Sequence, residues 1–368
     1  MRIVYLCKRH YMGKDVIADR YGRLYEQPYQ LALRGHEVLG ICGSYRKVEG
    51  RDENHIANSG SMRWIGLEVG SLGSLELPLQ YRRMSNLIRD FDPQIIVGAS
   101  DCPFIIMAFR LARKMNIPFA ADLYDHFEAF GLSRIPGVVP LYREALRQAA
   151  VVSCVSQPLA ELVREQYRAP GEVVALPSTI DRSLFYPRDQ KACRSQFKLP
   201  VNARLIGSAG GLSADKGILP LYQAFEGLSK QDPDLHLVLA GQIDPTCPPP
   251  AGDRVHYLGK LSHSQVAELF CALDVAVVYL RDTPYGRFSF PQKAFEVSAC
   301  GVSMAIARVG AMETVFKNSG AVLYEPDNAE SLAACICNLL SAPRRVAIDI
   351  PDWAQQAVTL EGLYEIMI

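Results

Sequence analysis

Short runs of apolar and β-branched residues alternate with longer amphipathic stretches along nearly the whole chain. In the first half, the apolar runs predict strands at 2–6, 37–41, 94–97, 118–122, 151–155 and 173–176. The amphipathic stretches between them predict helices near 21–34, 79–90, 103–114, 141–148 and 158–167. Continuous apolar strands separated by helices indicate a parallel sheet that is covered on both faces.

The same pattern restarts in the second half. Strands are predicted at 204–208, 235–240, 255–258, 275–279, 303–307 and 321–324, with helices near 217–229, 264–271, 291–299 and 329–340. The intervening segment 177–200 has three prolines and little strand pattern. We therefore predict two doubly wound, Rossmann-like α/β domains, 1–185 and 186–350, that face each other across a cleft. Residues 351–368 are predicted to form a helix that packs back on the first domain.

Composition narrows the classes of protein that fit. The 39 basic and 39 acidic side chains balance, which argues against a strongly basic nucleic-acid binder. None of the ten cysteines forms a Cys-x-x-Cys pair, and unpaired thiols are typical of a reducing cytosol. No apolar run approaches the ~18 residues of a membrane span. We expect a cytoplasmic protein without a metal centre.

Two common nucleotide motifs are missing. No Gly-x-Gly-x-x-Gly follows the first predicted strand, and no Gly-x-x-x-x-Gly-Lys-Ser/Thr occurs in the chain. A dinucleotide dehydrogenase and a P-loop phosphotransferase are therefore disfavoured. The pattern alone indicates a two-domain protein that handles a nucleotide or a sugar.

The first segment with candidate chemistry is Gly210-Gly211, followed by Lys216-Gly217, between a predicted strand and a predicted helix. Glycines let the backbone approach an anion, and the free N–H groups at a helix start favour phosphate. An ordinary strand–helix loop with a solvated lysine explains the same residues equally well.

The second segment carries Arg287, Ser289, Lys293 and Glu296 around Pro291, a residue suited to the first turn of a helix. Lys293 and Glu296 are three residues apart and share one helix face. Arg287 and Lys293 would neutralise a diphosphate, and Glu296 would accept hydrogen bonds from a ribose. Taken alone, a surface ion pair worth ~0.3–0.5 kcal/mol is the simpler interpretation.

Together, the two segments resemble the family 4 retaining glycosyltransferases of the GT-B fold. The family's Gly-Arg-Leu…Lys-Gly pattern is matched at every position except Gly211, which stands where the family usually has arginine. Glu296 matches the second glutamate of the family's Glu-x7-Glu signature, and Phe288 stands at the first. The segment is closer to a subgroup pattern, Ser-x-Pro-x-Lys-x-x-Glu, matched by Ser289, Pro291, Lys293 and Glu296.

In the first domain the resemblance is looser. The family often has a His-Asp pair after a strand; here Tyr124 stands at the histidine position, Asp125 at the aspartate, and His126 one residue later. A solvated strand-to-loop junction remains an open alternative for this acidic turn. Gly13 matches the position of the family's glycine-bearing first loop, for which the alternative is a flexible basic surface turn.

The resemblance implies a retaining transfer of a sugar from a nucleoside diphosphate sugar to a hydroxyl acceptor, in bacterial surface polysaccharide or glycoconjugate synthesis. The acceptor would be a glycan, a lipid-linked molecule or a small molecule. No metal, cofactor or nucleic acid is implied. Peripheral association with the inner face of the membrane is compatible with the basic helices of the first domain. The implied catalytic residues are Asp125, His126 and Lys216; the implied donor-binding residues are Gly13, Gly210, Gly211, Lys216, Arg287, Ser289, Lys293 and Glu296. Two alternatives remain open: an inactive nucleotide-sugar binding protein, and a nucleotide-sugar epimerase on the same fold.

Overall fold

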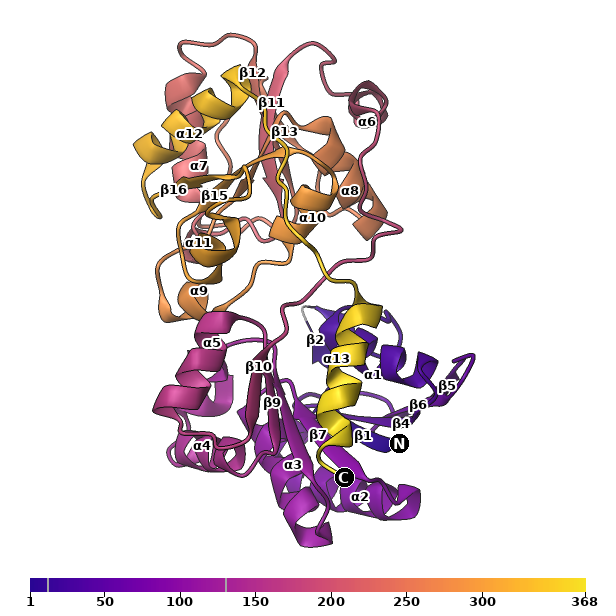
Figure 1. The fold of residues 1–368 in the computed structure, drawn as a ribbon. Helices are drawn as coiled ribbons and strands as arrows, with labels where there is room; N and C mark the ends of the chain where they lie inside the picture. The colour runs from indigo at the N-terminus through magenta and orange to yellow at the C-terminus, as the bar shows by residue number, and fades with distance from the viewer. Residues whose placement is uncertain (12, 130) are drawn as a thin grey trace. The chain divides into compact units, whose positions relative to one another are not determined.

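The computed structural model describes residues 1–11, 13–129 and 131–368. The chain divides into two compact units, which Figure 1 shows in different ranges of colour. Unit 1 comprises Met1–Ser178 and Trp353–Ile368, and unit 2 comprises Thr179–Asp352. Among the described residues, no helix combines the length and apolar character that a membrane crossing requires.

The described part of unit 1 is built on an eight-stranded sheet with the order β10-β9-β8-β7-β1-β4-β6-β5. Every neighbouring pair is parallel except β5 and β6, which are antiparallel. The strands are β1 (Arg2–Lys8), β4 (Glu37–Gly43), β5 (Arg51–His55), β6 (Ser61–Gly66), β7 (Ile95–Ala99), β8 (Phe119–Leu123), β9 (Val151–Cys154) and β10 (Glu172–Ala175). A small separate ribbon pairs β2 (His10–Tyr11) with β3 (Lys14–Asp15).

Helices cover this sheet because its central strands are apolar on both faces. In β1, for example, all five residues from Ile3 to Cys7 are buried. The helices are α1 (Arg23–Leu33), α2 (Leu77–Phe91), α3 (Cys102–Met115), α4 (Val138–Arg147), α5 (Gln157–Glu161) and α13 (Trp353–Glu365). Side-chain caps fix two of the helix starts: Asp101 accepts a hydrogen bond from the Phe104 N–H, and Ser156 accepts one from the Leu159 N–H.

The C-terminal helix α13 belongs to unit 1, although the whole of unit 2 separates it from the rest of that unit in sequence. It lies beside α1, as Figure 1 shows in yellow against indigo. Leu360 and Tyr364 of α13 are buried in the unit 1 core, and the Tyr364 hydroxyl lies 3.1 Å from that of Tyr5 in β1. The helix therefore completes the covering of the central strands.

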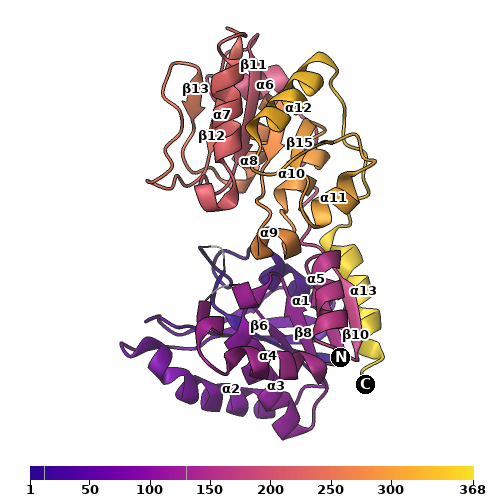
Figure 2. The same cartoon turned by 90° about the vertical axis from the view of Figure 1, so that its left-hand side faces the viewer.

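Unit 2 is built on a six-stranded, fully parallel sheet with the order β13-β12-β11-β14-β15-β16. The strands are β11 (Arg204–Ala209), β12 (Leu235–Ala240), β13 (Val255–Tyr257), β14 (Val275–Val278), β15 (Ser303–Ala307) and β16 (Val322–Tyr324). The helices are α6 (Gln190–Gln196), α7 (Leu219–Leu228), α8 (His263–Ala272), α9 (Pro284–Phe288), α10 (Lys293–Ala299), α11 (Ala311–Phe316) and α12 (Ala329–Ser341). Helices α7 and α12 pack side by side, which Figure 2 shows, and α6 packs on α8.

The boundary between the units lies after Ser178, whereas the sequence places it after residue 185. The segment that follows Ser178 is tied to the end of unit 2. Thr179 donates a hydrogen bond to the Pro351 carbonyl, and Arg182 donates one to the Ile350 carbonyl. Phe185 is buried. These contacts join residues far apart in sequence, which a pattern of prolines does not reveal.

Candidate functional site

The two glycines after β11 lie against the ends of two lysine side chains. Gly210 has φ +125°, in the range that favours glycine, and a methyl group there would lie 3.3 Å from Nζ of Lys293. A methyl group at Gly211 would lie 2.9 Å from Nζ of Lys216. The absence of side chains at both positions thus leaves room for two ammonium groups, which we call the lysine pair (Lys216 and Lys293).

The loop that carries these glycines is held by the neighbouring loop after β12. Gly241 has φ +123°, and a methyl group there would lie 1.8 Å from the Gly210 carbonyl oxygen. Further along, the Leu212 N–H donates to the Gln242 carbonyl at 2.8 Å, and the Asp244 N–H donates to the Leu212 carbonyl at 2.9 Å. Main-chain bonds on both sides therefore fix the position of the glycines.

Lys293 begins α10 and extends over an aromatic ring. Its Nζ lies 4.2 Å from the ring centroid of Tyr279, the residue directly after β14. The Tyr279 hydroxyl donates a hydrogen bond to the Gly211 carbonyl at 2.8 Å, so one tyrosine contacts both the lysine and the glycine loop. Burial and the charge of Lys216 lower the pKa of Lys293 to about 8, although Glu296 opposes the shift.

Glu296 lies one turn further along α10 and is 7% exposed. Gln292 donates a hydrogen bond to its Oε1 at 3.3 Å, and Nε2 of His263 lies 3.7 Å from the same oxygen. Burial raises the pKa of Glu296 to about 7, although Lys293 and the hydrogen bond from Gln292 oppose the shift. The carboxyl group is therefore divided between its charged and neutral forms near neutral pH.

Neither Lys216 nor Lys293 has its Nζ within 4.0 Å of a carboxylate oxygen of a residue that the structure describes. Two ammonium groups that repel each other and have no carboxylate of a described residue within ion-pair distance favour an anionic ligand, because a bound anion relieves the repulsion. Their position at the carboxyl end of parallel strands is where open α/β sheets bind ligands. The arrangement is suited to neutralising a phosphate or diphosphate.

Arg287 and Ser289, which the sequence groups with Lys293, are engaged in local contacts. Arg287 forms a bidentate pair with Asp282, with Nε 2.5 Å from Oδ1 and Nη2 3.0 Å from Oδ2. Ser289 is buried at the end of α9, where its hydroxyl donates to the Gly286 carbonyl at 3.3 Å. Helix α9 is five residues long and starts at a Thr283 cap, a feature that the apolar pattern does not signal.

The first-domain candidates lie in unit 1. Asp125 and His126 follow β8, and the His126 N–H donates to Oδ1 of Asp125 at 2.8 Å. Nε2 of His126 lies 3.3 Å from the Tyr167 hydroxyl, and burial lowers the pKa of the imidazole. Gly13 lies in the turn between β2 and β3 with φ +77°, and Met12 lies outside the described residues.

A buried ion pair next to these residues was not foreseen from the sequence. Arg23, the first residue of α1, and Asp122 of β8 are both at most 1% exposed, and Nη2 lies 2.6 Å from Oδ1. Ser153 donates to the same carboxylate at 2.5 Å, and Arg23 also donates to the Leu176 carbonyl. The sequence did contain one sign of this ion pair: Asp122 is a charged residue at the end of the otherwise apolar run 118–122.

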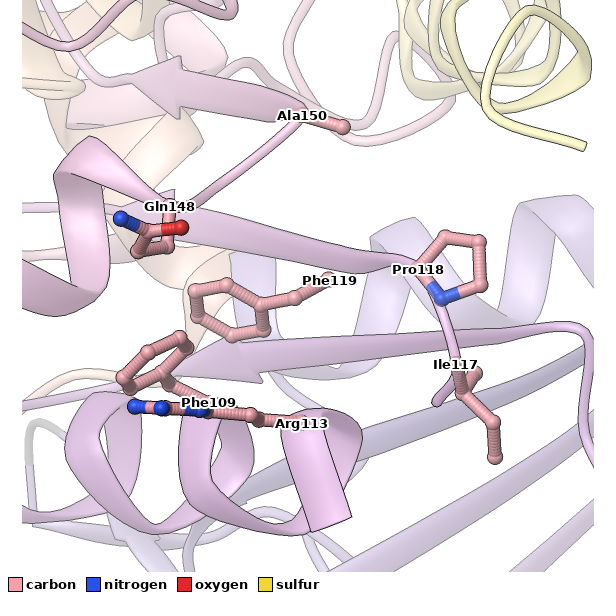
Figure 3. A pocket seen from close by; sticks show the side chains of 7 residues that line it. All are labelled: Phe109, Arg113, Ile117, Pro118, Phe119, Gln148 and Ala150. Carbon is pink, nitrogen blue, oxygen red and sulfur yellow. The ribbon is translucent and has the colours of Figure 1, made fainter. Parts of the chain in front are cut away.

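Unit 1 also has an open cavity of about 280 Å³, which Figure 3 shows. Pro118 and Ala150 line it and directly precede β8 and β9, so the cavity lies at the amino ends of these strands. Asp125 and His126 follow the opposite, carboxyl end of β8. The other lining residues are Phe109, Arg113, Ile117, Phe119 and Gln148.

Two families of known sequences match the chain. Residues 203–342 match the family described as "Glycosyl transferases group 1", and residues 23–179 match the "Glycosyl transferase 4-like domain". Together these matches cover most of both units. Each half of the chain is therefore similar to a glycosyltransferase domain family.

Two curated relatives are also named as glycosyltransferases. The chain is 29% identical over 289 residues to D-inositol 3-phosphate glycosyltransferase of Stackebrandtia nassauensis, covering 71% of the chain and 62% of that protein. It is 28% identical over 226 residues to D-inositol 3-phosphate glycosyltransferase 2 of Catenulispora acidiphila, covering 56% and 51%. The chain thus spans less than two thirds of the length of these relatives.

Solved structures show that the chain has the GT-B fold. Sucrose-phosphate synthase (tll1590) from Thermosynechococcus elongatus superposes with a TM-score of 0.75 at 20% identity, covering 100% of the chain and 97% of that structure. Anabaena Alr3699/HepE in complex with UDP superposes with a TM-score of 0.65 at 15% identity, again covering 100% and 97%. The predicted fold class, two Rossmann-like α/β domains, is confirmed.

Proposed function

We propose that this protein transfers a sugar from a nucleoside diphosphate sugar to a hydroxyl group, with retention of anomeric configuration. The observation that carries the proposal is the lysine pair, two ammonium groups at the Gly210-Gly211 turn that form no ion pair with a described residue. A glycosyltransferase needs positive charge at this kind of site, because negative charge develops on the departing diphosphate. Unit 2 would bind the donor and unit 1 the acceptor.

In the proposed reaction, Lys216 and Lys293 stabilise the leaving diphosphate, and the ionised carboxylate of Glu296 accepts hydrogen bonds from the ribose hydroxyls. Two ammonium groups would supply the charge, so the reaction as proposed needs no metal or organic cofactor. The departing phosphate would deprotonate the acceptor on the same face of the sugar, which preserves the anomeric configuration. Asp125 and His126 are proposed to contact the sugar or acceptor from unit 1.

The relatives suggest which ligands to test. Alr3699/HepE was solved with UDP, and separately with UDP-glucose, which makes UDP-sugars the first donors to try. The curated relatives are named for D-inositol 3-phosphate, which makes that compound the first acceptor to try. A hydroxyl group of a bacterial surface glycan or glycoconjugate is the wider acceptor class that we propose.

The test is a transfer assay with UDP-glucose and related donors against a panel of inositol phosphates, sugars and lipid-linked acceptors, in the presence and absence of EDTA. We expect a product whose anomeric proton coupling, measured by NMR, matches that of the donor. A product of opposite configuration would contradict retention. Loss of transfer with EDTA would contradict the metal-free reaction.

Two competing functions give different results in the same assay. An inactive binding protein, which Gly211 and Phe288 in place of the family's arginine and glutamate favour, would bind UDP-sugar without forming product. An epimerase would convert the donor when no acceptor is present. Product formation that depends on the acceptor would exclude both.

A further inference from the structure

Tyr279 joins two parts of the proposed donor site that come from different strands. It directly follows β14, whereas the Gly210-Gly211 turn directly follows β11. The two strands pair in parallel, so their carboxyl ends lie side by side. The Tyr279 hydroxyl donates a hydrogen bond to the Gly211 carbonyl at 2.8 Å, and Nζ of Lys293 lies 4.2 Å from the centre of the same ring.

The hydrogen bond of Tyr279 is a lasting one. The carbonyl of Gly211 has no proton to give, so the hydroxyl must be the donor. Tyr279 is 3% exposed, and burial raises the pKa of its phenol. The hydroxyl therefore keeps its proton while Lys293, with a pKa of about 8, gains or loses its own.

The lysine beside this ring has a reason to leave its position. A methyl group at Gly210 would lie 3.3 Å from Nζ of Lys293, and one at Gly211 would lie 2.9 Å from Nζ of Lys216, so both ammonium groups face the same turn. Like charges repel, and a long lysine side chain gains rotamer freedom when it turns towards water. A contact that opposes this movement is needed to keep Lys293 at the turn.

An aromatic ring holds a lysine without cancelling its charge. The negative face of the ring attracts the ammonium, but the ring itself is neutral. A carboxylate would hold the lysine as well, yet it would compete with a bound phosphate; no carboxylate oxygen of a described residue lies within 4.0 Å of Nζ of Lys293. A charge that is already in place also loses less freedom when an anion binds.

We propose that Tyr279 is a positioning residue of the donor site: its ring holds the Lys293 ammonium at the glycine turn, and its hydroxyl fixes the ring to that turn. Lys293 then meets the diphosphate beside Lys216. The inference rests on the proposed function, because Tyr279 acts through Lys293 and not on the reacting groups. The ring and the hydroxyl have separate roles, which two substitutions distinguish.

The first test is a calorimetric titration of the full chain with UDP. Tyr279→Leu removes the ring and the hydrogen bond, and should weaken binding about two- to thirtyfold. Tyr279→Phe keeps the ring and should recover most of this loss. Tyr222→Phe is the matched control: Tyr222 is a buried residue of α7, and its hydroxyl has no hydrogen-bond partner in the described structure. This control should bind UDP as the wild type does.

The second test separates positioning from a general loss of structure. In Tyr279→Leu the Lys293 ammonium should move towards water and away from Lys216, so the pKa of Lys293 should rise towards its ordinary value. The fall in UDP affinity near pH 8 should move to higher pH as well. Competitive labelling of lysines with acetic anhydride between roughly pH 6 and 11, followed by peptide mapping, measures this pKa without UDP. The exposed Lys230 is the internal reference.

Three results would overturn the proposal. Tyr279→Leu could bind UDP as tightly as the wild type, or more weakly with an unchanged dependence on pH. Tyr279→Phe could bind as weakly as Tyr279→Leu, in which case the ring has no role of its own. If the wild-type protein does not bind UDP, the proposed function fails, while the labelling still decides whether Tyr279 holds Lys293.

Discussion

At the residue scale, the proposed donor site depends on charges that the protein leaves unbalanced. Lys293 and Glu296 are three residues apart on α10. Burial lowers the pKa of Lys293 and raises the pKa of Glu296, so it favours the neutral form of both groups. A bound nucleoside diphosphate would return both groups to their charged forms, because the diphosphate attracts the ammonium and the ribose hydroxyls donate to the carboxylate.

The affinity for UDP should therefore depend on pH on both sides of a narrow optimum. As the pH rises through about 8, the free protein loses the Lys293 proton and affinity falls. As the pH drops through about 7, Glu296 gains a proton, can no longer accept two hydrogen bonds as a carboxylate, and affinity falls again. Calorimetry from pH 5.5 to 9.5, a range of roughly two pKa units around these values, checks both limbs. The loss of UDP affinity at low pH should become smaller in Glu296→Gln, and the loss at high pH should become smaller in Lys293→Ala. An unchanged pH dependence in both variants would contradict the roles given to these two residues.

The buried pair Arg23–Asp122 makes a second prediction at this scale. Replacing Asp122 with Asn leaves the Arg23 charge buried, and should lower the free energy of unfolding by about 3–5 kcal/mol. Urea denaturation measures the change. Asp52→Asn is the matched control, because its partner Arg63 is exposed and such pairs contribute about 0–1 kcal/mol. Equal changes in the free energy of unfolding for the two substitutions would show that the buried pair contributes no more to stability than the exposed pair.

The sequence identified Lys216, Lys293 and Glu296 as candidates through the order and spacing of motifs, but it did not reveal their mutual geometry. Gly210 meets the end of Lys293, which follows β14 in the chain, because β11 and β14 are neighbours in the sheet. The engagement of Arg287 with Asp282 depends on the short helix α9, which a periodicity of apolar residues cannot predict.

At the element scale, the site depends on close approach of two loops. The loops after β11 and β12 touch at Gly210 and Gly241, and Gly241 has no room for a side chain. The apolar pattern predicted these two strands, but it missed the polar edge strand β5, whose sequence Arg-Asp-Glu-Asn-His has no apolar alternation. Strand β5 is held by antiparallel pairing with β6, a contact that lies outside its own sequence.

Gly241→Ala should destabilise the protein, because the new methyl group would lie 1.8 Å from the Gly210 carbonyl oxygen and φ > 0 adds a cost of about 1–3 kcal/mol. Gly227→Ala is the matched control: it lies in α7 with nothing within 4 Å of the new methyl group. Gly227→Ala should raise the free energy of unfolding by about 0.5–1 kcal/mol. Thermal denaturation checks both, and a Gly241→Ala protein with unchanged melting would contradict the close approach.

At the scale of the whole molecule, unit 1 is built from two segments of the chain, and the whole of unit 2 lies between them in sequence. The sequence predicted that the segment after Pro351 forms a helix that packs back on the first domain, but the pattern did not show which core residues this helix contacts. The structure places Leu360 in the unit 1 core, fully buried, with Val358 on the solvent side at 51% exposed.

Leu360→Ala should therefore lower the free energy of unfolding of unit 1 by about 2–5 kcal/mol, whereas Val358→Ala should change it by no more than about 0.5 kcal/mol. Hydrogen exchange followed by mass spectrometry reports where the effect falls. We expect faster exchange in β1 and α1 for Leu360→Ala only. Faster exchange confined to unit 2 would contradict the assignment of α13 to unit 1.

The most direct test of the donor site is a calorimetric titration with UDP, GDP and ADP, performed on the wild-type protein and on Lys216→Ala. Loss of one charged hydrogen bond, about 1.5–3 kcal/mol, predicts roughly ten- to hundredfold weaker binding of the preferred diphosphate. Lys230→Ala, an exposed lysine just beyond the end of α7, should bind as wild type. No binding of any diphosphate to the wild-type protein, or equal binding by Lys216→Ala, would contradict the account.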